Sequence, residues 1–524
     1  MSAGWVLVAA LATAVAADEP EAPESEAAAP ETSESEASAP EAMRAKWTSK
    51  DGDLSVESWG HVRGLVNIPP DVVVDADGTS TGQDVVFDTR LRAGLALRYT
   101  GLTFATEWDF LDGQAAGDAW DLAVPVDERR RDAFLAGTLQ GVTPRRASLE
   151  AQIGRRFRFE GGLMPANTWG LGLLASGGTR EPLFGRLDRG DRMLRLLLSF
   201  APFSHEGQVL PLAVSVGFDR VVEDELARWG DGQEAYHLLT ALLWRDPEGR
   251  RLGVFYTFLA QTEAGERPRP TNAHVVDLYG EIPVDLGTSG WRLWVGAEGA
   301  LIAGSTQRLL TYGDLQDTTI LSGGAVAEVS IHAPKDLATI HLNAGYGSAT
   351  GDADAGVLQD FTFDRNYKVG LVLFDEVLGA IDAGTYALLD DRSTSGSTPR
   401  GADLLVREGS VGRSAYLQPA VTLQPLGWMR IRVGGLFAWS TGPIANPFYT
   451  FRAGGSPRNH LNEPSEGRYL ASEIDGQLLL GPGPTTAPWP VRPRVGVEGG
   501  VAFLGNDLGG GLAGLARVVV QADW

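Results

Sequence analysis

The sequence ends in GLAGLARVVVQADW, residues 511 to 524, and this stretch decides the fold class. Every second residue in it is apolar or small, and the terminal Trp524 continues that set. Arg517, Gln521 and Asp523 fall on the opposite face of an extended chain. Side chains alternate between two faces in a β-strand, whereas a helix repeats every 3.6 residues. The stretch therefore predicts a strand with one apolar and one polar face.

The same two-residue period recurs along most of the chain, in segments of about ten residues. In FDTRLRAGLALRY, residues 87 to 99, an apolar face opposes three arginines. Arginine is costly against lipid at the bilayer midplane but tolerated against a water-filled lumen. The residues that we expect to line such a lumen are Arg90, Arg92, Arg98, Arg292, Glu298, His341, Arg430, Arg432, Glu473, Asp475, Arg494, Glu498 and Arg517.

These segments predict an all-β fold, a single transmembrane antiparallel β-barrel. After residue 17 no apolar run reaches the roughly 18 residues that a transmembrane helix needs, which leaves a closed barrel as the way to cross a membrane. We expect about 18 strands, with 16 or 20 as alternatives, because bacterial barrels contain even numbers of strands. Residues 245–250 and 332–336 predict short periplasmic turns. Longer polar stretches predict extracellular loops at 304–318, 390–412 and 441–468.

The beginning of the chain predicts export. An apolar run from Trp5 to Ala17 precedes an acidic stretch, which is typical of a secretory signal peptide cleaved after Ala17. The next residues are mostly Glu, Ala, Pro and Ser, a composition that cannot bury enough apolar area to fold. We therefore expect a signal peptide (1–17), a disordered acidic segment (18–46) and a barrel (47–524) in the outer membrane of a Gram-negative bacterium.

Composition and motifs disfavour other classes of protein. The net charge of −23 argues against a nucleic-acid partner, and the lack of cysteine rules out disulfides and thiolate metal sites. The residues after Gly170 fit a dinucleotide fingerprint formally, but no helix pattern follows, so we expect a turn there. We expect no catalytic residues, no metal and no cofactor. For the acidic stretches 75–78 and 351–354, bound calcium is the alternative to solvated loops.

One segment breaks the alternation. Residues 367 to 389 read YKVGLVLFDEVLGAIDAGTYALL, and their apolar residues are too continuous for a strand between lipid and water. We expect a strand that runs into a helical or folded-in segment and constricts the pore near Phe374, Asp375 and Glu376. The alternative is a strand that faces a packed partner, or an apolar outer loop.

The inward arginines leave two interpretations open. Only four of the 44 basic residues are lysines. Arginine binds anionic groups bidentately, so a lumen lined by it would favour anions. Alternatively, the arginines pair with inward carboxylates such as Glu107, Asp109, Glu298, Glu473 and Asp475.

Stretches 162–178, 345–379, 472–482 and 495–505 resemble an uncharacterised outer-membrane family of myxobacteria. They are also similar, more distantly, to the alginate-export barrels. The similarity to the latter rests on Gly351-Asp352, Phe361, Phe363, Glu473 and Asp475. It implies an 18-stranded barrel with a polar, arginine-bearing lumen. The last strand resembles the targeting signal of bacterial outer-membrane barrels, which implies recognition of the strand ending at Trp524 by the barrel-assembly machinery.

These features together predict a passive channel for hydrophilic solutes, including anions, or for polysaccharide. Outer-membrane lipid and lipopolysaccharide are its expected surroundings. A structural or adhesion barrel with a plugged lumen is the first alternative, and an outer-membrane hydrolase is less favoured because no catalytic constellation is present.

Overall fold

The computed structural model describes residues 45–49, 53–118, 141–154, 156–177, 180–187, 190–202, 212–224, 226–263, 269–308, 317–350, 356–396, 402, 409–465, 467–482 and 491–524. The expected signal peptide, the acidic segment up to residue 44 and the acidic stretch 351–354 lie outside these residues.

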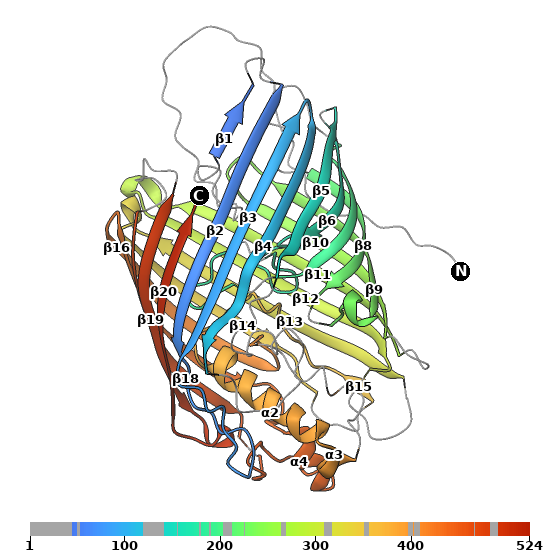
Figure 1. The fold of residues 1–524 in the computed structure, drawn as a ribbon, viewed down its shortest axis with the longest axis vertical. Coiled ribbons are helices and arrows are strands. Elements are labelled where there is room, and N and C mark those ends of the chain that lie inside the picture. The colour runs from blue at the N-terminus through green and yellow to red at the C-terminus, as the bar shows by residue number, and fades with distance from the viewer. Residues whose placement is uncertain are drawn as a thin grey trace.

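The described strands form one sheet of 20, and 18 of them make a closed antiparallel barrel (Figure 1), which confirms the predicted strand number. Two short strands lie outside this count: β1 (Ala45–Thr48) pairs with β2 in antiparallel orientation, and β15 (Val357–Leu358) pairs with β13 in parallel orientation. The wall strands are β2 (Leu54–Ile68), β3 (Val86–Tyr99), β4 (Leu102–Gly117), β5 (Thr143–Ile153), β6 (Phe157–Pro165), β7 (Arg192–Phe200), β8 (Leu212–Glu223), β9 (Glu234–Arg245), β10 (Arg251–Thr262), β11 (Pro270–Asp285), β12 (Arg292–Thr306), β13 (Thr318–His332), β14 (Ala338–Gly347), β16 (Ser414–Leu426), β17 (Met429–Ser440), β18 (Tyr469–Leu480), β19 (Arg492–Leu504) and β20 (Leu512–Asp523).

The outer face of the wall is apolar. On β3, Leu95 and Leu97 are exposed on the outer face. Ala96 between them and Arg90 earlier in the strand point inward and are buried. An apolar outer band is what a barrel presents to lipid hydrocarbon, so this is a barrel of the outer-membrane type. Representative members of the band are Leu196, Leu198, Leu242, Val254, Leu278, Leu301, Leu321, Leu342, Val421, Val433, Ile474, Val497 and Val518.

No helix in the described part of the chain is long and apolar enough to span a membrane. The α-helices within the described residues are α2 (Gly379–Asp390), α3 (Arg392–Ser395) and α4 (Pro447–Arg452), and a π-helix, η5 (Leu373–Leu378), precedes α2. The described 3₁₀-helices are η2 (Trp229–Asp231), η3 (Gly287–Ser289), η4 (Pro334–Asp336) and η7 (Asn506–Leu508).

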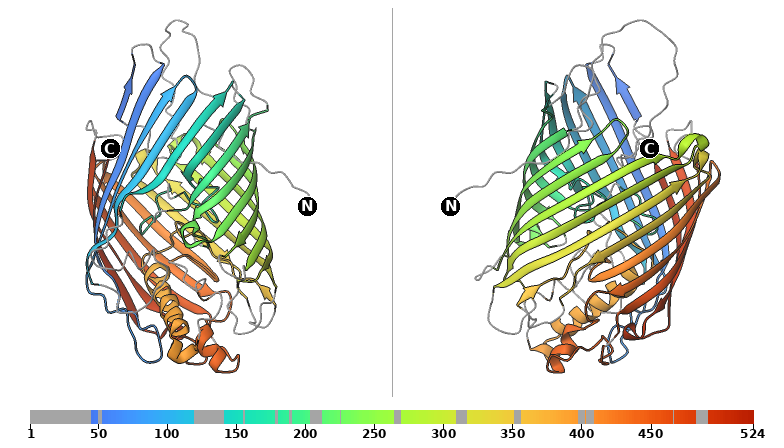
Figure 2. Two further views of the ribbon diagram at one scale, coloured as in Figure 1. Left: turned by 45° about the vertical axis from the view of Figure 1, so that its right-hand side comes forward. Right: turned by 180° about the vertical axis from the view of Figure 1, so that it is seen from behind.

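The two ends of the barrel differ. Helices α2, α3 and α4 gather at the end opposite the C-terminus (Figures 1 and 2), which we call the loop end. The expected turns at 245–250 and 332–336 join β9 to β10 and β13 to β14. The connection between β17 and β18, residues 441–468, carries α4 at the loop end. Short periplasmic turns and longer extracellular loops are the usual arrangement in such barrels.

The seam between the first and last wall strands is closed by backbone pairing and by the terminal aromatic. β2 and β20 pair from His61 with Asp523 to Ile68 with Ala516. Trp524 continues this pairing, because its backbone N–H donates to the Gly60 carbonyl at 3.0 Å. The Trp524 ring lies over Gly60 so closely that a Cβ at that position would overlap it.

We therefore expect Gly60→Ala to reduce the yield of folded barrel and to destabilise it by about 1–3 kcal/mol, the usual cost of overpacking. The measurement is the fraction of heat-modifiable barrel on gels at increasing temperature. Gly64→Ala is the matched control on the same strand, because its Cβ would meet Phe87 only at 3.7 Å. Equal effects of the two changes would contradict the role given to Trp524.

A hydrophobic core lies inside the barrel. It contains apolar residues from the β2–β3 loop, from residues 171–184 and from residues 361–381. In the described structure, these residues pack against one part of the wall, β12, β13 and β16 to β20. The wall residues of this core are Ala300, Val326, Tyr416, Ala420, Leu436, Ala438, Leu470, Ala471, Ala502, Ala513 and Leu515. The interior of the barrel is therefore partly filled.

Candidate functional site: the barrel interior

The connection between β6 and β7 crosses the interior. We call its described residues between 166 and 191 the first inner segment. Trp169 Nε1 donates to Asp277 on β11 at 3.1 Å, and Arg180 forms a bidentate ion pair with Glu328 on β13. Further along, it contacts β17 and then β3. Its wall partners, in order, are Asp277, Glu298, Glu328, Arg430, Arg432, Asp88 and Arg90.

A second inner segment, residues 359 to 390, enters from the connection that follows β15. Tyr367 donates to Glu328 at 2.9 Å and accepts from Tyr416 at 3.2 Å. Asp364 joins the two segments, because its backbone N–H donates to the Leu173 carbonyl and its carboxylate accepts from the Ser176 N–H, both at 2.8 Å. The two inner segments therefore form one packed unit that is tied to the wall.

Each inner segment is held by a wall glutamate in the same way. Glu298 on β12 accepts hydrogen bonds from the backbone N–H groups of Leu171 and Leu173. Glu473 on β18 accepts from three consecutive N–H groups, those of Leu371 at 2.6 Å and of the next two residues at 2.8 Å. Successive N–H groups that point to one place form a concave site for an anion. We call these two contacts the glutamate latches.

A glycine makes each latch feasible. Gly170 has φ +54° and Gly370 has φ +69°, in the left-handed region that glycine adopts without strain. Each is followed at once by the N–H groups that bind the glutamate. A Cβ on Gly370 would lie 2.8 Å from Glu473 Oε1, and one on Gly170 would crowd Glu298. The similar sequences GLGLL (170–174) and GLVLF (370–374) therefore adopt the same local conformation, in which backbone N–H groups bind a wall glutamate.

The opposite part of the wall is charged. In the described structure, none of the residues of the main interior core belongs to β3 to β8, whose inner face we call the polar sector. Arg92 holds Asp109 through two hydrogen bonds of 2.6 and 2.9 Å. Arg145 lies 3.4 Å from Glu107 and 3.7 Å from Asp109. Further ion pairs in this sector are Arg90–Asp112, Arg158–Glu150, Arg195–Asp219 and Arg192–Glu223.

Most arginines that the sequence singles out are paired with carboxylates. Arg98 lies 3.2 Å from Glu57, and Arg517 binds Glu498 at 2.8 Å. Arg92 pairs with Asp109 as given above. The other ion pairs of this set are Arg90–Asp112, Arg430–Glu181 and Arg494–Asp523. These contacts favour the interpretation of charge pairing over that of free anion-binding arginines.

Three predicted residues have other surroundings. Arg432 donates to Thr422 and to the carbonyls of Pro182 and Leu183 in the first inner segment. His341 bonds to Ser330 at 2.9 Å and to Thr422 at 3.1 Å. Arg292 is 42% exposed and pairs with Asp336 in the β13–β14 turn, so it lies at the end of the barrel rather than within it.

The predicted constriction residues lie in or beside the interior core. Phe374 is buried in it, Asp375 accepts from Lys368 at 3.1 Å, and Glu376 lies 3.6 Å from Arg517. Asp475 is buried beside Glu473 on β18. The structure brings Glu298 and Glu473 to the inner segments and Arg90, Arg92 and Arg98 to the polar sector. That these residues line the path of a solute stays a prediction.

Sequence reasoning missed the first inner segment. Its stretch 171–175, LGLLA, lacks alternation, as 367–389 does, but the glycines around it predict only a turn. The missed residues include Arg180, Glu328 and Tyr367. The repeated glycine-leucine string was the signal that could have identified both segments.

The acidic stretch 75–78 has a local explanation. Asp75 Oδ1 accepts from the backbone N–H groups of Asp77 and Thr79, both at 2.9 Å. Such a bond pattern stabilises a turn by itself. Among the described residues, no group of three or more acidic or histidine side chains is arranged to hold a metal ion.

No family model and no curated protein matches the chain. Solved structures that resemble it are outer-membrane channels. They include OpdK of Pseudomonas aeruginosa with vanillate (10% identity, TM-score 0.46, covering 90% of this chain and 99% of that one) and OccAB1 of Acinetobacter baumannii (10%, 0.47, 90% and 96%). A BenF-like porin from Pseudomonas fluorescens has 8% identity and a TM-score of 0.45, and covers 90% and 98%. Identities this low leave the solute of this chain open, and the similarity to myxobacterial and alginate-export proteins stays a prediction.

Proposed function

We propose that the protein is a passive channel of the outer membrane that lets hydrophilic solutes, including anions, pass along the polar sector. The observation that carries the proposal is the division of the interior. In the main interior core, the inner segments pack against β12, β13 and β16 to β20 through apolar contacts. The inner face of β3 to β8 carries mainly ion pairs, and the first inner segment touches it only locally, through contacts such as those of Trp169 with Leu197 and of Arg186 with Asp88. A charged inner wall is typical of a water-filled lumen, and here each charge is largely buried against its ion-pair partner. A water-filled passage is therefore expected beside the polar sector rather than along the barrel axis.

Planar-bilayer recording tests this function. The purified full chain is expected to produce discrete conductance steps in KCl, and liposomes that contain it are expected to swell in small neutral and anionic solutes. A closed barrel with no steps and no swelling would overturn the proposal. Passage of polysaccharide, as the alginate-export similarity implies, would require swelling or release assays with oligouronates to succeed as well.

The interior core supports a second candidate function, a structural or adhesion barrel with a plugged lumen. Residues of both inner segments are fully buried in that core, including Leu173 and Leu373. Absence of conductance together with binding to cells or surfaces would favour it. For both candidates, we propose lipid and lipopolysaccharide around the apolar band and recognition of the last strand, ending at Trp524, by the barrel-assembly machinery.

Neutralising Asp109 is expected to shift the selectivity of the channel toward anions. Asp109 pairs with Arg92 and lies 3.7 Å from Arg145. Asp109→Asn removes this negative charge, so the polar sector gains net positive charge. Breaking a buried ion pair also destabilises the barrel, by about 3 kcal/mol. The reversal potential in a KCl gradient measures the shift. Asp336→Asn, which unpairs the exposed Arg292, is the control and should leave the potential unchanged.

A further inference from the structure

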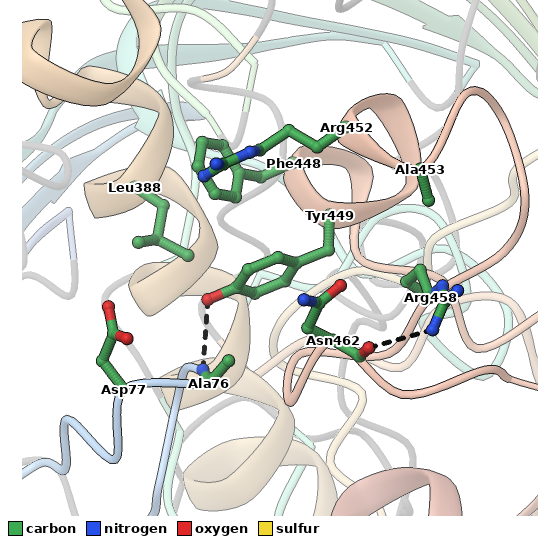
Figure 3. Close-up of a pocket in the computed structure, with 9 residues that line it drawn as sticks. All are labelled: Ala76, Asp77, Leu388, Phe448, Tyr449, Arg452, Ala453, Arg458 and Asn462. Carbon is green, nitrogen blue, oxygen red and sulfur yellow. Dashed lines mark hydrogen bonds between the residues drawn. The ribbon is translucent and has the colours of Figure 1, made fainter.

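A hollow of about 440 Å³ lies at the loop end (Figure 3), between the β2–β3 loop, α2 and the loop that contains α4. Sites for small molecules usually measure roughly 300–1,000 Å³. The proposed passage assigns nothing to this hollow. Its position at the loop end places it on the side from which external solutes arrive.

The walls of the hollow are held together by hydrogen bonds. Tyr449 accepts from the backbone N–H of Ala76 at 3.1 Å, which joins α4 to the β2–β3 loop. Asn446 caps α4 by accepting from the N–H groups of Phe448 and Tyr449. The Asn446 amide also donates to Thr385 on α2 at 2.7 Å. The three elements are therefore held together around the hollow.

Two arginines of this hollow lack carboxylate partners. Arg452 lies over the Phe448 ring, 5.3 Å from its centre, and Arg458 lies beyond Tyr449 near Asn462 (Figure 3). Arg458 Nη1 donates to the Asn462 carbonyl at 3.2 Å, and its Nε has no hydrogen-bond partner. Within the described part of the chain, neither guanidinium forms an ion pair. The arginines of the polar sector, such as Arg92, are paired instead.

The remaining charges near the hollow limit the ligand further. Burial lowers the pKa of His460 to about 4 and raises the pKa of Tyr449, so both are neutral at pH 7. Asp77 contributes an exposed carboxylate on the side of the β2–β3 loop (Figure 3). A ligand therefore meets two guanidiniums, one amide and one exposed carboxylate. The buried carboxylate of Asp75, which is engaged by backbone N–H groups, lies close enough to influence Tyr449 and His460. Guanidinium matches a carboxylate bidentately, while Asp77 accepts from hydroxyl groups and repels a second negative charge.

We propose that this hollow binds a small hydroxylated monocarboxylate before it enters the barrel. The inference rests on the proposed channel function and adds a solute class and a capture site to it. Arg452 and Arg458 supply the positive charge, and Asn462 and Asp77 supply hydrogen bonds to hydroxyl groups.

Three probes that share a six-carbon hydroxylated chain and differ in charge test the proposal. They are sorbitol, which is neutral, gluconate, which carries one carboxylate, and glucarate, which carries two. Calorimetric titration of the full chain in detergent should show saturable binding of gluconate, weaker binding of glucarate and none of sorbitol. Arg452→Gln or Arg458→Gln should weaken gluconate binding about tenfold or more, because charge-assisted hydrogen bonds are lost. Asp77→Asn should strengthen glucarate binding.

Arg468→Gln is the matched control, since Arg468 is an exposed arginine of the same loop that donates to the Thr441 carbonyl outside the hollow. Heat-modifiable migration shows whether each variant is folded, and Arg458→Lys, which keeps the charge, should retain part of the affinity. Sorbitol binding as tightly as gluconate, inorganic phosphate displacing gluconate at equal concentration, or an equal loss in Arg468→Gln would overturn the site. Conductance in KCl is measured separately, so a conducting barrel without gluconate binding refutes the site alone, and a gluconate-binding barrel without conductance refutes the channel alone.

Discussion

Replacing residues 374 to 389 with a short Gly-Ser linker is expected to raise the single-channel conductance. This replacement removes most of η5 and nearly all of α2, including Phe374, Val377 and Ala380, which belong to the interior core. The wall should remain closed, because its 18 strands are joined by their own backbone pairing and by the β2–β20 seam. Space now filled by side chains would become available to water and ions.

The measurement is single-channel conductance in planar bilayers, with heat-modifiable migration to show that the barrel is closed. Replacing residues 454–457 by Gly-Ser is the matched control, since these exposed residues also lie at the loop end but outside the interior core. Its conductance should equal that of the unchanged chain. If the 374–389 replacement gives a folded barrel with unchanged conductance, the segment does not constrict the passage.

The wall of the barrel could be predicted from sequence because each of its strands is a local pattern. Alternation assigns every residue to one of two faces, and Leu97 and Arg90 on β3 are outside and inside as the pattern requires. Gly, Asp and Pro mark the turns, and the even strand number of bacterial barrels limits the count to 18, with 16 or 20 as alternatives. Because every wall strand has lipid hydrocarbon on one face and polar groups on the other, its apolar and polar residues alternate with the same two-residue period.

The interior could be predicted only in part, because its contacts join residues far apart in sequence. The continuous apolar run 367–389 indicates burial, but it does not reveal that Glu473 would hold it or that Tyr367 would meet Glu328. The pairing of Arg430 with Glu181 likewise depends on a loop that crosses the interior. A charged residue on an inward face has the same alternation whether it faces water or a packed segment. The alternation of the sequence therefore cannot distinguish an arginine that lines the pore from one that binds an inner segment.

Breaking the Glu473 latch is expected to loosen the second inner segment without opening the wall. Glu473→Ala leaves three buried N–H groups without their acceptor, at a cost of about 1–3 kcal/mol for each unsatisfied group. We expect a loss of about 3 kcal/mol or more, and single-channel currents that fluctuate between levels as the segment moves. Glu298→Ala should act in the same direction but less strongly, because Glu298 holds two N–H groups.

Glycine substitutions test the same latch without removing the carboxylate. Gly370→Ala should reproduce the current fluctuations, because its Cβ would lie 2.8 Å from Glu473 Oε1 and its φ of +69° disfavours alanine. Gly476→Ala on β18 is the matched control, since its Cβ meets nothing within 4 Å. If Glu473→Ala and Gly370→Ala both lower the unfolding temperature but leave quiet, unchanged currents, the latch stabilises the barrel and does not restrict its passage. Fluctuating currents in both, with steady currents in Gly476→Ala, would identify the second inner segment as the part that controls passage, because the two changes share only the contact between Glu473 and that segment.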